Sequence, residues 1–288
     1  MINIKGMIRS ISFLGMFFLM SICYSLAQGP KLLIRIDDIG MNHSVNMALK
    51  DAANTKMKLS ASVMFACPWY QEAVEILKEN PQISVGVHLT LNSEWKNYRW
   101  GPVLGKEAVP TLVAEDGYFY PSTQEFLDAD YDLDEVEREL EAQIQRAIST
   151  GLKVDYIDFH MRTALATPEL TEITKKLADK YNMKRSMLMG EGYKSLFGTE
   201  ISQKETDLLT HLEQGLDKGK VNLVIMHMAK ANPEMKALVD MNNADQRGEE
   251  GKPVVAMHRE AELQALLSVE LMGMIKNKNI QLVNYGDF

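Results

Sequence analysis

Four short apolar segments of this sequence each end in an acidic or imidazole side chain. The residues that share this position are Asp37 and Asp38, His88, Asp158 and His160, and His227. Buried carboxylates and imidazoles are costly without partners, and a divalent cation is a partner that suits both. One histidine after a strand is commonly structural, whereas three of them together with paired aspartates indicate a site. We therefore predict that these residues meet around a metal.

The surrounding pattern predicts how the chain brings them together. Seven apolar segments look like strands buried on both faces: residues 31–36, 59–65, 83–89, 154–159, 185–189, 221–226 and 280–284. Amphipathic helices are expected between them, most clearly at 133–149, capped by Asp132, and at 260–275. The alternation predicts a single α/β domain, an incomplete TIM-like barrel of seven parallel strands. Ligands bind such sheets at the carboxyl ends of the strands.

Residues 92–129 interrupt this alternation and are rich in aromatic side chains and prolines. The rings are Trp95, Tyr98, Trp100, Tyr118, Phe119 and Tyr120. Two interpretations are open: a loop that packs on itself, or an aromatic lip that stacks against sugars above the site. Cys67 lies in an apolar run and is expected to pack rather than react. His211 in a helix, His43 in a loop and His258 at a helix start are expected to be structural or solvated.

Several motifs occur in an order that resembles a known family. They are Asp37-Asp38-Ile39-Gly40 with Asn46, Ser62-Val63-Met64, Gly86-Val87-His88-Leu89, Gly151-Leu152, Asp158-Phe159-His160, Met226-His227, and Arg259 followed by Leu263-Gln264-Ala265-Leu266-Leu267. This set resembles the YdjC-like carbohydrate deacetylases, which are relatives of chitooligosaccharide deacetylase, over essentially the whole chain after its N-terminal segment. The resemblance implies a seven-stranded β/α barrel and metal-dependent removal of an N-acetyl group from an acetylated sugar or oligosaccharide.

Residue by residue, the resemblance assigns roles to the five strand-end groups. It implies that Asp38, His88 and His160 bind the metal, that Asp37 is the general base, and that His227 is the candidate acid. Such a cation lowers the pKa of a bound water and acts as a Lewis acid on a carbonyl oxygen, as amide hydrolysis requires. The free carboxylate can then accept the water's proton, and the imidazole can protonate the leaving nitrogen. Zinc suits these ligands best; nickel, cobalt or magnesium remain open.

Other residues are expected to support the site or contact the substrate. Asp158 could orient a ligand or the base, or it could be only a turn or cap residue. Arg162 stands where family members often have another histidine, and Met228 stands where a proline commonly follows the later histidine. These departures leave the accepted sugar or acyl group open. Arg259 joins Asp158 and Arg162 in this supporting group.

The N-terminal segment has the pattern of an export signal. Lys5 and Arg9 precede an uncharged apolar run, residues 11–23, and Ser25-Leu26-Ala27 supplies the small residues of a cleavage site. We expect residues 1–27 to be removed before Gln28, which leaves 28–288 as the deacetylase domain of a periplasmic or secreted protein. An uncleaved anchor is the alternative. After cleavage Cys67 is the one remaining cysteine, so no intramolecular disulfide can form.

The net charge argues against nucleic acid and anionic membranes as partners, and two alternative functions remain open. A formal net charge of -8 provides no basic footprint for nucleic acid or an anionic membrane. The expected partner is an acetylated mono- or oligosaccharide, and the sequence leaves the oligomeric state open. A glycoside hydrolase could use Asp37 and Asp38, but neighbours on a strand point to opposite sides. A non-catalytic carbohydrate-binding protein on the same fold is the other alternative.

Overall fold

The computed structural model describes residues 29–243 and 254–288. The expected export signal, residues 1–27, and its cleavage position lie outside this part of the chain. No helix among the described residues is long and apolar enough to cross a membrane.

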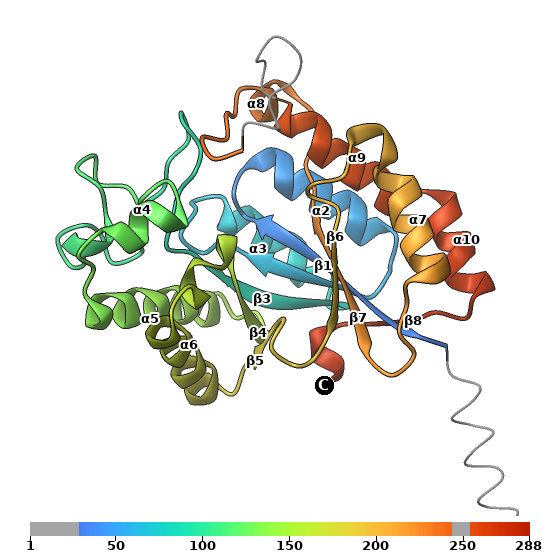
Figure 1. Ribbon diagram of the computed structural model, residues 1–288, viewed down its shortest axis with the longest axis horizontal. Helices are drawn as coiled ribbons and strands as arrows, with labels where there is room; N and C mark the ends of the chain where they lie inside the picture. Colours follow the sequence, from blue (N-terminus) through green and yellow to red (C-terminus); the bar gives the residue numbers. More distant parts are fainter. Residues whose placement is uncertain (1–28, 244–253) are drawn as a thin grey trace, which may run out of the picture.

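One parallel sheet forms the centre of the molecule (Figure 1). Its strands are β1 (Lys31–Ile39), β2 (Leu59–Val63), β3 (Ile83–Leu89), β4 (Val154–Phe159), β5 (Lys184–Arg185), β6 (Gly192–Ser195), β7 (Val221–His227) and β8 (Gln281–Val283). Seven of them follow the order β5-β4-β3-β2-β1-β7-β6, and β8 pairs with β1. The sheet curls into a barrel. The barrel stays open because, within the described residues, its two edge strands β5 and β6 do not pair. The predicted incomplete barrel is confirmed.

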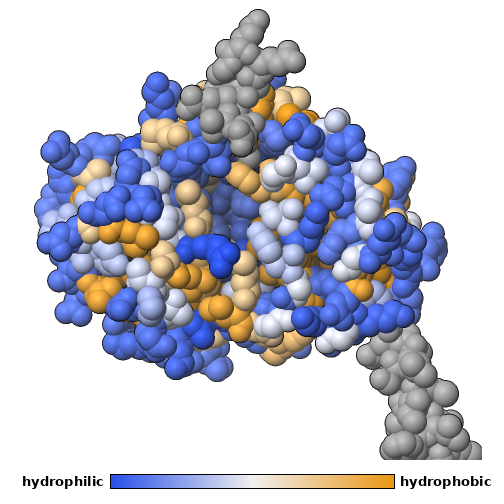
Figure 2. Space-filling model, viewed as in Figure 1, coloured by the Kyte–Doolittle hydropathy of each residue, from blue (hydrophilic) through white to orange (hydrophobic). Residues whose placement is uncertain are grey.

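Helices cover the outer face of this sheet, and the space-filling view shows a hollow between them (Figure 2). The helices are α2 (His43–Asn54), α3 (Tyr70–Lys78), α4 (Thr123–Asp128), α5 (Leu133–Ser149), α6 (Pro168–Tyr181), α7 (Lys204–Gln214), α8 (Pro233–Lys236), α9 (Val255–Leu267) and α10 (Val269–Asn277). Helix α5 has the predicted bounds because Asp132 caps it, accepting hydrogen bonds from the backbone N–H groups of Asp134 and Glu135. Short 3-10 segments include η1 (Pro110–Leu112), η2 (His160–Leu165), η3 (Ile201–Gln203) and η6 (Tyr285–Asp287).

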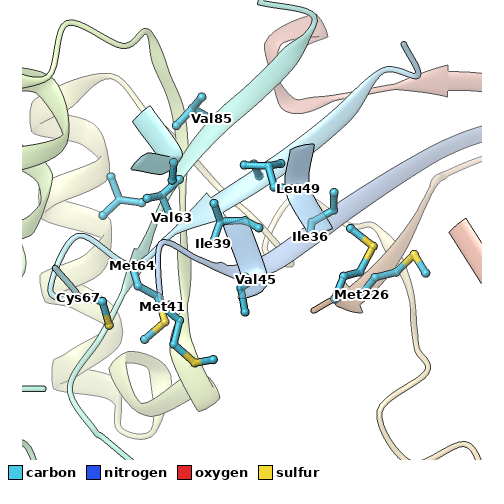
Figure 3. Packing of buried hydrophobic residues seen from close by; sticks show 14 of the residues in the cluster. Ile36, Ile39, Met41, Val45, Leu49, Val63, Met64, Cys67, Val85 and Met226 are labelled. Atoms are coloured by element: carbon cyan, nitrogen blue, oxygen red, sulfur yellow. The ribbon is translucent and has the colours of Figure 1, made fainter. Parts of the chain in front are cut away.

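The alternation of side chains along β1 separates two cores. Leu32, Ile34 and Ile36 belong to the large core between sheet and helices. Figure 3 shows Ile36 in this core. Leu33 points the other way, into a smaller cluster with Tyr156 that fills the barrel interior. Arg35 and Asp37 have the same parity as Leu33, so they lie above this interior cluster, at the carboxyl end of the barrel. The barrel floor is therefore apolar and its upper end is charged.

Cys67 packs in the large core, as expected (Figure 3). The side chain is fully buried and makes no disulfide. Burial raises the pKa of the thiol, and the neighbouring carboxylates Glu94 and Asp38 raise it further. A buried thiol with a raised pKa is a poor nucleophile.

The predicted strand at 185–189 is wrong. β5 ends at Arg185, and the chain then turns because Met187 and Gly190 adopt left-handed φ angles of 67° and 82°. The Glu191 carboxylate accepts hydrogen bonds from the backbone N–H groups of Met187 and Met189, which holds the turn. The sequence pattern also missed β6, which follows immediately.

The predicted helix at 260–275 is two helices. α9 ends at Leu267 and α10 begins at Val269, because Ser268 has an extended backbone and caps the second helix. Its hydroxyl accepts a hydrogen bond of 3.2 Å from the backbone N–H of Leu271. A continuous apolar pattern concealed this break.

Candidate active site

A pocket of about 340 Å³ opens at the carboxyl ends of β1, β3, β4 and β7. Seven of the eight predicted site residues line it: Asp37, Asp38, His88, His160, Arg162, His227 and Arg259. Asp158 is fully buried directly beneath the lining. The strand ends thus bring Asp37, Asp38, His88, Asp158, His160 and His227 together, as the sequence predicts, and Arg162 of η2 and Arg259 of α9 join them from outside the sheet.

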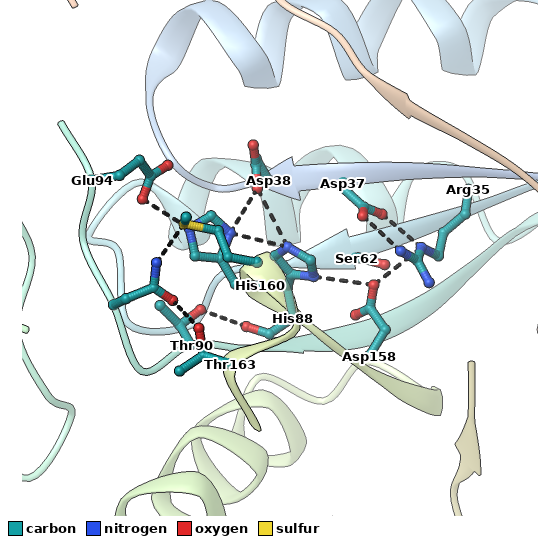
Figure 4. Close-up of polar contacts among 12 residues, drawn as sticks. Arg35, Asp37, Asp38, Ser62, His88, Thr90, Glu94, Asp158, His160 and Thr163 are labelled. Carbon is teal, nitrogen blue, oxygen red and sulfur yellow. Dashed lines mark hydrogen bonds and ion pairs between the residues drawn. The ribbon is translucent and has the colours of Figure 1, made fainter. Parts of the chain in front are cut away.

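Asp38, His88 and His160 direct three donor atoms at one another (Figure 4). Asp38 Oδ1 lies 3.3 Å from His88 Nε2 and 3.2 Å from His160 Nδ1, and the two nitrogens are 3.3 Å apart. All three side chains are buried, and Asp38 Oδ1 has no hydrogen-bond partner among the described residues. Asp38 reaches this position because its left-handed φ of 62° interrupts the register between β1 and β2.

Each imidazole turns its second nitrogen to a buried carboxylate. His88 Nδ1 lies 3.1 Å from Asp158 Oδ2, and His160 Nε2 lies 2.9 Å from Glu94 Oε2. The His160 contact is a hydrogen bond, whereas His88 and Asp158 lie within ion-pair distance only. A carboxylate at the outer nitrogen favours the hydrogen there and a lone pair on the inner nitrogen, as in metal-binding histidines. The donor set and its outer partners therefore fit a divalent cation.

Charge compensation in the pocket is dense. Arg259 on α9 donates a 2.6 Å hydrogen bond from Nη2 to Asp38 Oδ2 and lies 5.5 Å from the centre of a Trp95 ring. Burial would raise the pKa of Asp38, but Arg259 and the two imidazoles outweigh burial and hold this pKa well below its usual range. The Asp38 carboxylate is therefore negatively charged in the absence of a cation and can act as a ligand.

The imidazole pKa values describe the protein without a cation. Burial would lower both, but Asp158 and Asp38 raise the pKa of His88 to about 10. Glu94 and Asp38 likewise raise the pKa of His160 to about 9. A metal would have to displace protons held in this cluster.

Asp37 lies beside the three-donor cluster of Asp38, His88 and His160 and has a different partner. Both of its carboxylate oxygens accept hydrogen bonds of 2.7 Å from Arg35, whose Nε also lies 3.1 Å from Asp158 Oδ2 (Figure 4). Arg35 is not among the residues predicted from the sequence, although a charge inside a buried strand, two residues before Asp37 and on the same face, is a usable signal.

His227 ends β7 directly beside Asp37, its register partner on β1. In the described chain its Nδ1 has no hydrogen-bond partner, and its ring lies 5.9 Å from that of Phe197. The His227 backbone N–H donates a 2.6 Å hydrogen bond to Glu262, which forms a buried ion pair of 2.7 Å with Lys204. His227 therefore faces the pocket from a fixed backbone, outside the three-donor cluster.

The aromatic loop, Arg162 and Met228 differ in how they relate to the pocket. Of the aromatic rings in 92–129, Trp95 lines the pocket, whereas Trp100 and Phe119 are packed in the core. The aromatic lip is therefore wrong for most of this loop, because its rings pack against the chain's own core. Arg162 is exposed at the pocket with a left-handed φ of 61°. Met228 is fully buried in the core.

The other histidines lie outside the pocket lining. His43 begins α2 rather than lying in a loop, and its Nδ1 lies 2.8 Å from Glu72. His211 lies in α7 and His258 near the start of α9, and burial lowers the pKa of both.

Comparison with known proteins places this geometry in a family. A model of YdjC-like proteins matches residues 31–277, which include every lining residue discussed above. The chain belongs to the YdjC-like family. A carbohydrate deacetylase from Brevibacillus brevis is 29% identical over 263 residues, covering 89% of this chain and 99% of that protein. One from Thermoanaerobacter pseudethanolicus is 25% identical over 258 residues, covering 88% and 98%.

A solved structure shares the fold of this YdjC-like protein. The crystal structure of a cellobiose-phosphate cleavage protein from Enterococcus faecalis superimposes with a TM-score of 0.69 at 24% identity. The match covers 90% of this chain and 99% of that one, so the two proteins share the fold over nearly their whole length.

Proposed function

We propose that this YdjC-like protein is a metal-dependent hydrolase that removes an N-acetyl group from an acetylated sugar or oligosaccharide. The observation that carries the proposal is the convergence of Asp38, His88 and His160, each imidazole backed by a carboxylate. Two relatives that the chain matches over nearly their whole length are named carbohydrate deacetylase, and this supports sugar deacetylation.

The three donors would hold a divalent cation, for which zinc is the best match to two imidazoles and one carboxylate. When bound, the cation supplies Lewis acidity toward the acetyl carbonyl and toward water. Arg259 holds Asp38 Oδ2, which leaves Oδ1 to face the two imidazoles. Glu94, through its hydrogen bond to His160, and Asp158, through its ion-pair contact with His88, would orient the two rings.

The protein's own groups would move the protons. Asp37, fixed by Arg35, would accept a proton from the water that attacks the acetyl carbon. His227 faces the same pocket from the neighbouring strand and would donate a proton to the sugar nitrogen as the carbon–nitrogen bond breaks. Acetate and a free amino sugar would result, with one water consumed.

The surroundings of the two aspartates favour this chemistry over glycoside hydrolysis. Asp37 pairs with Arg35, while Asp38 pairs with Arg259 and faces two imidazoles. A glycosidase needs two carboxyl groups that face each other across one bond. Adjacent residues with separate partners do not provide that arrangement.

The experiment that tests the proposal measures acetate release from a panel of N-acetylated sugars and oligosaccharides. Metal-stripped protein is compared with protein reconstituted with zinc, nickel, cobalt or magnesium. The proposal predicts acetate release that depends on the metal. Release of new reducing ends would identify a glycosidase, and binding without either product would identify a carbohydrate-binding protein.

We also propose that the protein is exported. Support comes from the charged, apolar and small-residue pattern of residues 1–27. A periplasmic or secreted location would give the site access to extracellular acetylated sugars.

A further inference from the structure

The C-terminal segment delivers one side chain to the interior of the barrel. Tyr285 follows β8 in η6, and its backbone N–H donates a 3.3 Å hydrogen bond to Ser60 of β2. The Tyr285 ring is fully buried in the interior cluster, where its centre lies 4.2 Å from that of the Tyr156 ring. A ring enclosed by such close packing holds its hydroxyl group in one place.

The Tyr285 hydroxyl links two polar groups that lie far apart in the sequence. It is hydrogen-bonded to Ser186, the residue after β5, and it donates a 3.0 Å hydrogen bond to Oε1 of Glu191. Ser186 Oγ in turn accepts a 2.5 Å hydrogen bond from Nη1 of Arg35, the residue that binds Asp37 (Figure 4). We call Arg35, Ser186, Tyr285 and Glu191 the interior chain.

The donors and acceptors of the interior chain permit one direction only. A guanidinium can only donate hydrogen bonds, and a carboxylate can only accept them. Ser186 accepts from Arg35, so it gives its own hydrogen to Tyr285, which gives its hydrogen to Glu191. Ser186 and Tyr285 are both fully buried, so the loss of either hydroxyl leaves a neighbouring polar group without a partner and without water.

The interior chain occupies the edge of Arg35 that Asp37 leaves free. Asp37 accepts from Nε and Nη2 of Arg35, while Ser186 accepts from Nη1, so the guanidinium cannot rotate without breaking a buried hydrogen bond. At the other end of the chain, Oε1 of Glu191 also accepts a 3.0 Å hydrogen bond from the backbone N–H of Met187, which lines the pocket. One buried network thus connects the proposed base to a wall of the pocket.

We propose that Tyr285 is a positioning residue for Asp37. Through Ser186, its hydroxyl holds Arg35 in the orientation that fixes both oxygens of the Asp37 carboxylate. The inference rests on the proposed function, which makes Asp37 the group that accepts the proton of water. Tyr285 is not among the residues that line the pocket, so it acts through Arg35 and not on the substrate.

The test begins with Tyr285→Phe, which keeps the buried ring and removes the hydroxyl. In metal-loaded protein kcat for acetate release should fall by roughly tenfold, because a small displacement of a reacting group costs a large factor in rate. KM and zinc content should not change. In an Asp37→Asn background the same substitution should cause no further loss, since the group that Tyr285 positions is gone. A general folding defect would lower kcat in both backgrounds.

Two variants sharpen the comparison. Tyr156→Phe removes the hydroxyl of the adjoining buried ring, which is bonded to Ser62 at 2.8 Å and takes no part in the interior chain. It should leave kcat unchanged. Ser186→Ala interrupts the chain one group closer to Arg35 and should reproduce the effect of Tyr285→Phe, and the double variant should lose no more than either single variant.

Hydrogen exchange of the Arg35 Nε–H group tests the positioning without turnover. Its NMR signal is identified by its absence in Arg35→Lys. In Tyr285→Phe and Ser186→Ala this hydrogen should exchange about tenfold faster than in wild type, because the guanidinium has lost one of its buried partners. The exchange rate in Tyr156→Phe should equal that of wild type.

Three results would overturn the role of Tyr285: an unchanged kcat in Tyr285→Phe, an unchanged exchange rate of the Arg35 Nε–H group, or an equal loss of kcat with and without the Asp37 carboxylate. If wild-type protein releases no acetate from any substrate, the proposed function fails. Faster exchange in Tyr285→Phe would then still show that Tyr285 positions Arg35, and unchanged exchange would refute it.

Discussion

Nε2 of His160 lies 2.9 Å from Oε2 of Glu94, a buried carboxylate from the loop that follows β3. The contact determines which nitrogen of His160 faces Asp38 and His88, because the outer nitrogen carries the hydrogen that Glu94 accepts. Asp158 on β4 lies 3.1 Å from Nδ1 of His88, within ion-pair distance. The two imidazoles are thus oriented by carboxylates from different segments of the chain.

Glu94→Gln should weaken metal binding by about 10- to 100-fold, the usual effect of removing a carboxylate behind a ligand histidine. Equilibrium dialysis with zinc measures the change. Glu72→Gln is the matched control, because Glu72 pairs with His43 at 2.8 Å outside the pocket lining. Equal zinc affinity in wild type and Glu94→Gln would show that the contact does not tune the site.

Metal binding should strengthen as pH rises. In the metal-free protein the pKa of His88 is raised to about 10 and that of His160 to about 9, so the cluster holds protons at pH 7 that a cation must displace. Release of at least one proton makes the apparent affinity rise by roughly tenfold or more per pH unit below these values. Calorimetry at pH 6, 7 and 8, in buffers of different ionisation enthalpy, counts the released protons. A pH-independent affinity would contradict the expectation.

His227→Ala should keep its metal and lose turnover by about 10²- to 10⁴-fold, the scale of one general acid or base. Its ring faces the pocket but lies outside the three-donor cluster. Metal content and acetate release are measured on the same preparation, with His211→Ala on α7 as the control. Near-normal turnover, or loss of the metal, would mean that His227 has another role.

The mature protein should begin near Gln28 and fractionate outside the cytoplasm. The prediction follows from the charged, apolar and small-residue order of residues 1–27. N-terminal sequencing of the secreted or periplasmic protein measures it. Recovery of Met1 in that fraction would show an uncleaved segment instead.

The strand-end residues were predictable because two simple regularities act together. Buried strands are apolar throughout, and parallel strands place their carboxyl ends at one edge, so Asp38, His88 and His160 had to meet. The same reasoning located the five buried strands that carry or flank the site. It also located α5, whose stripe of apolar residues and Asp132 cap are both local signals.

The missed features depend on contacts between distant segments. Glu94 lies in a loop without periodicity, and its importance comes from His160, 66 residues away. β6 has four residues, Gly-Tyr-Lys-Ser, and Tyr193 is exposed. Its sequence therefore shows no alternation of apolar and polar residues that would predict a strand. Aromatic content drew attention to residues 92–129, but the rings there mostly serve the core. Sequence composition could not distinguish a packed ring from one that lines a pocket.

The most direct test of the account is the metal content of Asp37→Asn and Asp38→Asn, measured beside their acetate release. Asp38 faces two imidazoles, whereas Asp37 is held by Arg35. Asp38→Asn should lose metal, because an amide is a poorer ligand for a dication. Asp37→Asn should keep its metal and lose turnover by about 10²- to 10⁴-fold. Metal lost from Asp37→Asn and kept by Asp38→Asn would contradict the assignment.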